Sequence, residues 1–135
     1  MATKKPRKVS VSSLHKKLWP VFSRYVRIKE SYDGWGQCVT CSVKKPWQEL
    51  QAGHFASRRF KSTLYDEMNV HTQCFACNCM LSGNLLIYRR VMDDRYSPQA
   101  VEELEQRAKQ TKKYTTGELG VMLDEYTAKV KELES

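Results

Sequence analysis

Four of the five cysteines of this 135-residue chain form two C-x-x-C pairs, Cys38 with Cys41 and Cys74 with Cys77. Each pair can place two thiolates about 2.3 Å from one tetrahedral ion, and the second pair then fills the other two corners. A single C-x-x-C is also a redox motif, but two pairs in a short chain without a βαβ pattern favour structural zinc. Four sulfurs close the coordination shell, so we expect this Zn²⁺ to stabilise the fold and not to catalyse. Cys79 is expected to be a packed or free thiol.

Basic residues are concentrated in two segments. Residues 1–30 contain nine Lys and Arg and one acid, whereas the rest of the chain is neutral overall. Five further bases accompany one acid between residues 44 and 61. A basic terminus alone is equally compatible with a solubilising tail, but two basic segments favour a polyanionic partner such as DNA. The residues that we assign to DNA contact are Lys4, Lys5, Arg7, Lys8, Lys16, Lys17, Arg24, Arg27, Arg58, Arg59 and Lys61.

The composition excludes several classes of protein. With 41% hydrophobic and 28% charged residues, the chain is typical of a globular protein and not of a disordered one. No apolar run approaches the roughly 20 residues that a membrane-spanning helix needs, so we expect no membrane partner. The N-terminus is basic with no apolar stretch behind it, which predicts no secretory signal, a cytoplasmic location and reduced cysteines.

Hydrophobic periodicity divides the chain into three parts. Residues 1–12 form a basic arm without periodicity. Residues 13–95 contain a first helix and a zinc-bound core, and residues 96–135 contain a pair of helices that begin near Ser97 and Thr115.

Several local features refine this division. Ser12 or Ser13 is the expected cap of the first helix, and Pro20 should kink or divide it. Short strands are expected within residues 46–55 and 68–73. We expect a helix from Cys74 onward that buries apolar residues and that the Ser-Gly-Asn run at 82–84 interrupts; those residues are Phe75, Leu81, Leu85, Tyr88 and Met92.

The 32 residues between the two cysteine pairs exceed the roughly 15–20 of a simple zinc ribbon, so this interval must contain folded structure. Within it, His54 ends one strand-like run and Asn69 precedes another. Asn78 directly follows the second pair. A hairpin and a helix tied to one zinc ion would bring His54 and Asn78 close together.

This arrangement resembles the ββα-metal, or HNH, nucleases, and in particular the endonuclease VII-type resolvases. Over most of residues 13–130 the chain is similar to the NinG (Rap) family of lambdoid phage recombination proteins. The stretches that carry this resemblance are Leu14–Trp19, Phe22–Arg27, Cys38–Cys41, Gln51–Phe55, Asn69–His71, Gln73–Cys74, Cys77–Asn78 and Ser82–Asn84.

The resemblance implies an α+β fold with a zinc-braced ββα-metal (HNH-like) core and N-terminal and C-terminal helices. It implies a phage-encoded, metal-dependent endonuclease that cleaves branched DNA, such as Holliday junctions and D-loops, in the host cytoplasm during recombination. His54 would be the general base, Asn69 would pin the intervening loop, and Asn78 would bind a catalytic Mg²⁺ or Mn²⁺.

One position departs from the resemblance. Many HNH proteins place Asp or His just before the base, where it binds the metal, and this chain has Gly53 there. The second protein ligand is therefore open, and the candidates are Glu49, Asp66, Glu67, His71 and Asn84. The position of His71 on a short strand favours a structural residue, and Asn84 also fits a helix cap.

Resolving a junction takes two cuts, which predicts a homodimer formed through the C-terminal apolar stripe or the first helix. Two other functions remain open. The chain can be a zinc-dependent DNA-binding accessory protein without cleavage, for which Gly53 is the main argument, or a sequence-specific HNH endonuclease.

Overall fold

The computed structural model describes residues 9–135, so the predicted DNA contacts of Lys4, Lys5, Arg7 and Lys8 lie outside the described residues. Four α-helices and two small antiparallel hairpins make a mixed α+β fold, as predicted. In chain order the elements are α1 Val11–Lys29, β1 Trp35–Gln37, β2 Lys44–Pro46, β3 Gln51–His54, β4 Val70–Gln73, α2 Leu85–Tyr96, α3 Pro98–Ala108 and α4 Thr116–Glu134.

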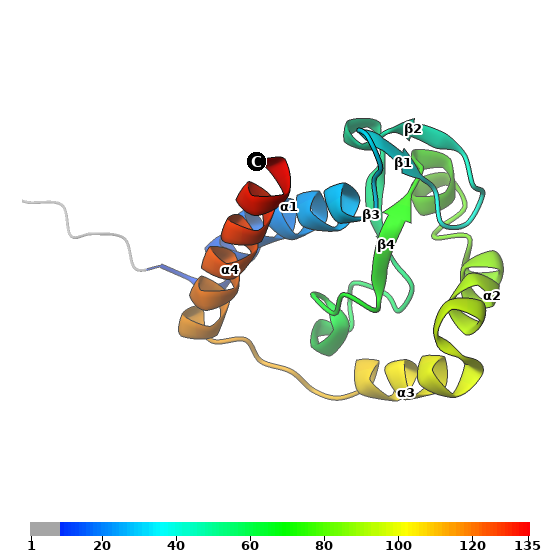
Figure 1. Ribbon diagram of the computed structural model, residues 1–135. Helices are drawn as coiled ribbons and strands as arrows, with labels where there is room; N and C mark the ends of the chain where they lie inside the picture. The colour runs from blue at the N-terminus through cyan, green and yellow to red at the C-terminus, as the bar shows by residue number, and fades with distance from the viewer. Residues whose placement is uncertain (1–8) are drawn as a thin grey trace, which may run out of the picture.

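Helix α1 begins at a capping box in which Ser10 and Ser13 bond each other's backbone N–H groups. The cap is thus Ser10 and not Ser12 or Ser13. Pro20 lies inside the helix without dividing it. Its ring is exposed to solvent. The buried apolar residues of α1 pack along α4 on both sides of Pro20, and this packing keeps the helix continuous (Figure 1).

The apolar stripe of α4 is used within the chain. Leu119, Tyr126 and Val130 are buried in the same core as Leu18 and Phe22 of α1. The two faces that we considered for a homodimer interface therefore cover each other. Helix α3 packs on α2 and not on α4, so the C-terminal helices do not form a pair (Figure 1).

Two hairpins lie between α1 and α2. Strands β1 and β2 pair antiparallel, with Gly36 opposite Lys45. Strands β3 and β4 pair with Gln51 opposite Gln73 and His54 opposite Val70. The strand expected over 46–55 is shorter, because residues 47–49 form a 3₁₀ turn and residues 44–46 belong to the first hairpin.

The helix expected from Cys74 is instead a short π-helical turn, Ala76–Met80, followed by a separate helix α2. Ser82, Gly83 and Asn84 all have positive φ, which breaks the helical path between them. Tyr88 and Met92 are fully buried on α2, as expected. The expected burial of Phe75, Leu81 and Leu85 is wrong, because each of these residues is at least half exposed.

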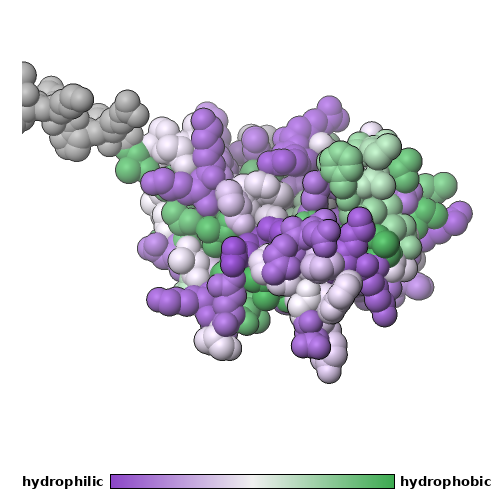
Figure 2. All heavy atoms as spheres, turned by 90° about the horizontal axis from the view of Figure 1, so that it is seen from above, coloured by the Kyte–Doolittle hydropathy of each residue, from purple (hydrophilic) through white to green (hydrophobic). Residues whose placement is uncertain are grey.

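The face drawn in Figure 2 is mostly hydrophilic, with an exception at one end. Figure 2 shows hydrophobic side chains gathered at the right, the end that carries β1 and β2 in Figure 1. Exposed apolar residues of the first hairpin and the π-helical turn include Trp35, Phe75 and Met80. Within the described residues, no helix has both the length and the apolar character needed to cross a membrane.

The α1–α4 core predicts a large loss of stability for Phe22→Ala. Phe22 is fully buried and its ring lies 5.0 Å from that of Tyr126 and 5.5 Å from that of Tyr65. Truncation leaves a cavity and should lower the free energy of unfolding by about 3–5 kcal/mol in urea denaturation. Tyr32→Ala is the control, because Tyr32 is 87% exposed and its loss should cost little. Equal stability of the two variants would contradict this packing.

Candidate functional site

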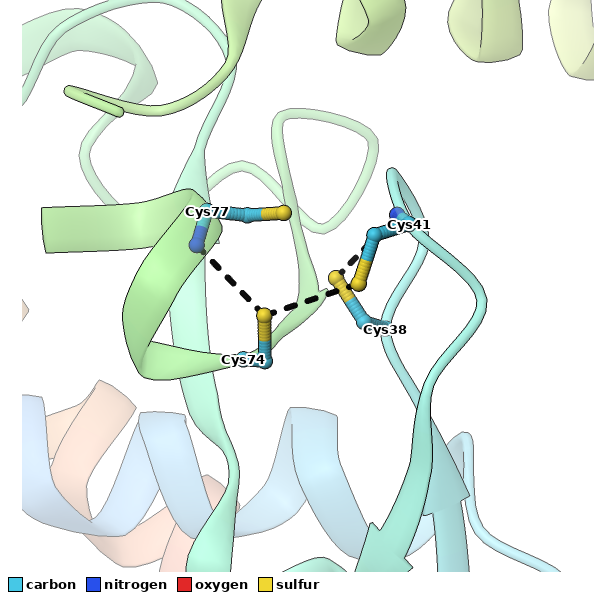
Figure 3. Close-up of side chains that lie close together, drawn as sticks. All are labelled: Cys38, Cys41, Cys74 and Cys77. Carbon is cyan, nitrogen blue, oxygen red and sulfur yellow. Dashed lines mark hydrogen bonds between the residues drawn. The ribbon is translucent and has the colours of Figure 1, made fainter. Parts of the chain in front are cut away.

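The four paired cysteines converge, as predicted. Their Sγ atoms all lie within 4.8 Å of one another, and Cys41 Sγ is 3.6 Å from Cys74 Sγ. Tetrahedral zinc at about 2.3 Å from each sulfur requires sulfurs about 3.8 Å apart, so this donor set fits the ion. In Figure 3 one pair comes from the turn after β1 and the other from the end of β4 and the turn that follows. The cluster can hold a metal ion such as zinc.

Backbone N–H groups complete each pair. Cys41 N donates to Cys38 Sγ at 3.5 Å and Cys77 N donates to Cys74 Sγ at 3.4 Å. Burial opposes ionisation of Cys38, but hydrogen bonds from Thr40 and from backbone N–H groups outweigh it and lower the pKa of the Cys38 thiol. This favours the thiolate that zinc requires. Cys79 is exposed outside the cluster, with its Sγ 3.3 Å from Gln51 Oε1.

His54 is the last residue of β3 and is only 8% exposed. Its Nε2 lies 3.0 Å from the carbonyl oxygen of Leu64, which can only accept, so Nε2 carries the hydrogen and Nδ1 keeps a free lone pair in the neutral ring. The Trp19 ring of α1 stacks on the imidazole with centroids 4.9 Å apart. Burial outweighs the opposing effect of the Leu64 bond and, together with the nearby charge of Arg58, lowers the pKa of His54 to about 4. His54 is therefore a neutral base near pH 7.

Asn78 lies in the π-helical turn directly after Cys77. Its Nδ2 donates to Gln51 Oε1 at 2.7 Å. This bond fixes the orientation of the amide and does not involve Oδ1, which can still accept. His54 and Asn78 line the same cavity of about 420 Å³, together with Arg58, Ser57, Ser82 and other residues. Two residues 24 positions apart in sequence are thus brought to one cavity.

Asn69 is fully buried and ties together the loop between β3 and β4. Its Oδ1 accepts from Ala56 N at 2.7 Å, and its Nδ2 donates to Ala56 O at 3.0 Å and Thr63 O at 3.1 Å. The loop carries Leu64, whose carbonyl oxygen bonds His54, and Arg58, which lines the same cavity as His54. Asn69 therefore positions the loop from behind and does not line the cavity.

The five other candidate ligands, Glu49, Asp66, Glu67, His71 and Asn84, do not line this cavity. His71 is 4% exposed and bonds Glu30 Oε2 at 2.6 Å, which ties β4 to the end of α1. Asp66 pairs with Arg107 at 3.0 Å. Asn84 occupies the cap position of α2 without a capping bond, and its Nδ2 lies 3.7 Å from Cys77 Sγ.

The predicted DNA-contacting residues that the structure describes separate into those bonded within the chain and those that are not. Arg24 pairs with Glu134, and Arg27 donates to the carbonyls of Leu50 and Trp47 at 3.3 and 3.5 Å. Both arginines are thus bonded to partners within the chain, Arg24 at the surface. A second cavity, of about 960 Å³, is lined by four cations around Trp19, His15 and Tyr65, and those cations are Lys16, Arg58, Arg59 and Lys61. Lys17 is exposed on α1.

Sequence reasoning missed two residues of this region. For Trp19 the sequence favours core packing, with stacking on unpaired bases as the alternative, and it does not indicate that Trp19 borders the second cavity and stacks on His54. Gln73 is 0% exposed although nothing in a short polar strand sequence indicates burial. Its position directly before Cys74 is the one available signal, because a residue next to a metal ligand is held by the cluster.

The cysteine cluster predicts different outcomes for two Cys→Ser substitutions. Cys74→Ser removes one sulfur from the closed shell, so zinc bound per chain should fall and the free energy of unfolding should drop by about 3 kcal/mol or more, lowering Tm by about 10 °C or more. Cys79→Ser is the matched control and should keep zinc and Tm. Elemental analysis and thermal unfolding measure both. Full zinc content in Cys74→Ser would contradict the cluster.

The buried imidazole predicts a loss of stability in acid. Above pH 6.5, the ordinary pKa of histidine, both folded and unfolded His54 are neutral and its contribution is fully present. As the pH falls from 6.5 towards the folded value of about 4, only the unfolded chain gains a proton, and stability is lost. The loss should reach about 3 kcal/mol relative to His54→Gln, measured by urea denaturation across this range. Parallel pH profiles for the two proteins would show that His54 is not buried in neutral form.

Comparison with known proteins assigns the family. A family model described as "Bacteriophage Lambda NinG protein" matches residues 2–135. Among curated proteins, the chain is 36% identical over 97 residues to Protein ninG of Salmonella phage P22, covering 71% of this chain and 47% of that protein. It is 32% identical over 99 residues to Protein ninG of Escherichia phage lambda, covering 73% of this chain and 48% of that protein. The chain thus spans about half the length of these relatives.

No solved structure matches the chain. The match of the family model covers nearly the whole sequence and includes the cysteine cluster and the cavity lined by His54 and Asn78. This chain belongs to the NinG family of bacteriophage proteins.

Proposed function

We propose that the chain is a metal-dependent endonuclease that cleaves branched DNA in the host cytoplasm during phage recombination, and that its core is of the HNH type. The observation that carries the proposal is the cavity in which a neutral histidine, an amide oxygen and an arginine meet: His54, Asn78 and Arg58. Phosphodiester hydrolysis needs a base that takes a proton from water and positive charge near the phosphate and the leaving oxygen. His54 can act as the base, Arg58 carries positive charge, and Asn78 can bind a divalent cation that adds more.

The proton path follows from the hydrogen bond of His54. Because Nε2 donates to Leu64 O, Nδ1 is the nitrogen that can take a proton from water. The water oxygen forms a bond to phosphorus, the bond from phosphorus to the 3′-oxygen breaks, and the 3′-oxygen takes a proton from solvent. The low pKa of His54 keeps it unprotonated before this step.

The residues at the cavity fit a hard divalent cation. Asn78 supplies a neutral amide oxygen whose orientation is fixed by its bond to Gln51. A Cβ at Gly53 would lie 3.0 Å from Asn78 Oδ1, so the absence of a side chain keeps this oxygen accessible from the strand. When bound there, Mg²⁺ or Mn²⁺ would supply positive charge for the phosphate and the leaving oxygen.

The cavity around Trp19 supports a nucleic-acid partner. Four cations line it, and none of them forms an ion pair within the described part of the chain, so their charge is available to phosphates. Arg58 borders both cavities and lies 4.7 Å from the centre of the Trp19 ring. Because Arg58 lines both cavities, it can contact a strand held here and a phosphate in the His54 cavity.

A homodimer is part of the proposal, because junction resolution takes two cuts. The α1 and α4 stripes are buried against each other, so a dimer would use another face.

His54→Ala separates an enzyme from a DNA-binding accessory protein. The substitution should lower the cleavage rate of a four-way junction by about 10²–10⁴-fold while junction binding is retained, because the base is lost and the cation-lined surface is kept. Zinc-loaded protein should be assayed with Mg²⁺ added or omitted, with no chelator that would strip the cysteine cluster. Tyr32→Ala is the exposed control.

The outcomes of this assay distinguish the alternatives. Binding without any metal-dependent cleavage in the native protein would indicate the accessory function. Equal cleavage of a linear duplex of the same sequence would indicate a sequence-specific HNH endonuclease. Cleavage by His54→Ala at the native rate would overturn the role of His54.

A further inference from the structure

Gln73, the last residue of β4, has a buried amide with one unused end. The side chain is 0% exposed, and its Nε2 donates to Gly83 O at 2.9 Å and to Thr40 Oγ1 at 3.2 Å. These two acceptors fix which end of the amide is nitrogen. Within the described residues, Oε1 has no hydrogen-bond donor. A buried acceptor without a partner lowers the stability of the fold by about 1–3 kcal/mol, and a ligand bound to this oxygen would remove that cost.

The unused oxygen faces Gly53 from across the hairpin. A Cβ at Gly53 would lie 1.8 Å from Gln73 Oε1 and 3.0 Å from Asn78 Oδ1. Gln73 Oε1 thus occupies the position that a side chain at residue 53 would take, and the amide oxygen of Asn78, a residue that lines the His54 cavity, lies next to it. Asn78 connects this position to the base, because it lines the same cavity as His54.

Neither amide can donate a hydrogen bond to the oxygen of the other. Asn78 Nδ2 is bonded to Gln51, and Gln73 Nε2 is bonded to Gly83 and Thr40, so both amides present oxygen towards Gly53. Adjacent acceptors repel each other unless a cation or a water molecule lies between them. Neutral amide oxygens are suitable ligands for Mg²⁺ or Mn²⁺, which complete their shell with water and phosphate oxygens.

We propose that Gln73 Oε1 and Asn78 Oδ1 together bind the divalent cation of the site, with Gln73 supplying the ligand that Gly53 cannot. This inference rests on the proposed function, because it assigns a ligand to the same cation.

The cysteine cluster positions this ligand. Thr40 Oγ1, which accepts from Gln73, lies 3.2 Å from Cys38 Sγ, and Gly83 N donates to Cys77 O at 2.9 Å. Both partners of the Gln73 amide are thus tied to a cysteine of the cluster. Zinc occupancy should therefore affect divalent cation affinity although the two sites use different side chains.

The first test uses the native, zinc-loaded protein and needs no substitution. Addition of Mg²⁺ without DNA should shift the side-chain NH₂ signals of Gln73 and Asn78 in ¹⁵N NMR spectra, and should leave those of Gln37, whose amide donates to Ser42 O, unchanged. Saturating Mg²⁺ that shifts Asn78 and leaves Gln73 in place would overturn the inference.

The second test measures Mn²⁺ affinity by electron paramagnetic resonance. Gln73→Met removes the oxygen at similar length and should weaken Mn²⁺ binding by at least about tenfold, whereas Gln37→Met should not. Gly53→Asp with Gln73→Ala places a carboxylate in the vacated space and should restore binding. A zinc-loaded Gln73→Met protein with native Mn²⁺ affinity, or a zinc-loaded double variant without Mn²⁺ binding, would contradict the inference.

Failure of the inference and failure of the proposed function give different results. If Gln73 is not a ligand, Mg²⁺-dependent junction cleavage by the native protein persists while the NMR and Mn²⁺ results fail. If the chain is not a nuclease, the native protein shows no metal-dependent cleavage at all.

Discussion

The convergence of four cysteine sulfurs is the interaction on which the rest of the site depends. The strands are three or four residues long and form two separate two-stranded hairpins, which are marginal structures on their own. Cys38 and Cys41 follow β1, and Cys74 and Cys77 follow β4, so a metal ion shared by the four sulfurs would join the hairpins. The Val39 N to Thr72 O bond at 2.8 Å supports the same junction. Asn78, next to Cys77, is thereby held opposite β3 and His54.

The surroundings of His54 follow from this clamp and from α1. Trp19 covers one face of the imidazole, and the Asn69-tied loop supplies the Leu64 carbonyl that selects the tautomer. The ring is consequently buried and neutral, yet it borders a cavity with an arginine on its wall. A general base near neutral pH needs this combination of an unprotonated nitrogen and access to substrate. The neighbouring cation-lined cavity extends the same surface, which connects the proposed chemistry with a polyanionic partner.

Patterns that depend on local spacing could be predicted from the sequence, and those that depend on tertiary contacts could not. The cysteine cluster, the α+β class and helices α1, α3 and α4 follow from C-x-x-C spacing, period and caps. The break before α2 was expected, but the π-helical turn was not, because cluster geometry and three positive φ values override helix propensity there. Burial of Gln73 and the use of Arg27 inside the protein arise from partners distant in sequence.

The central claim is that one cavity holds the base His54 and the amide oxygen of Asn78, and that both act on a single phosphate. A crystal structure of the zinc-loaded protein with a four-way junction, and Ca²⁺ in place of Mg²⁺, tests it most directly. The account predicts a DNA phosphate in the His54–Asn78 cavity, with a phosphate oxygen or a water molecule about 3 Å from His54 Nδ1. A junction bound on another face, with no phosphate in that cavity, would contradict the account.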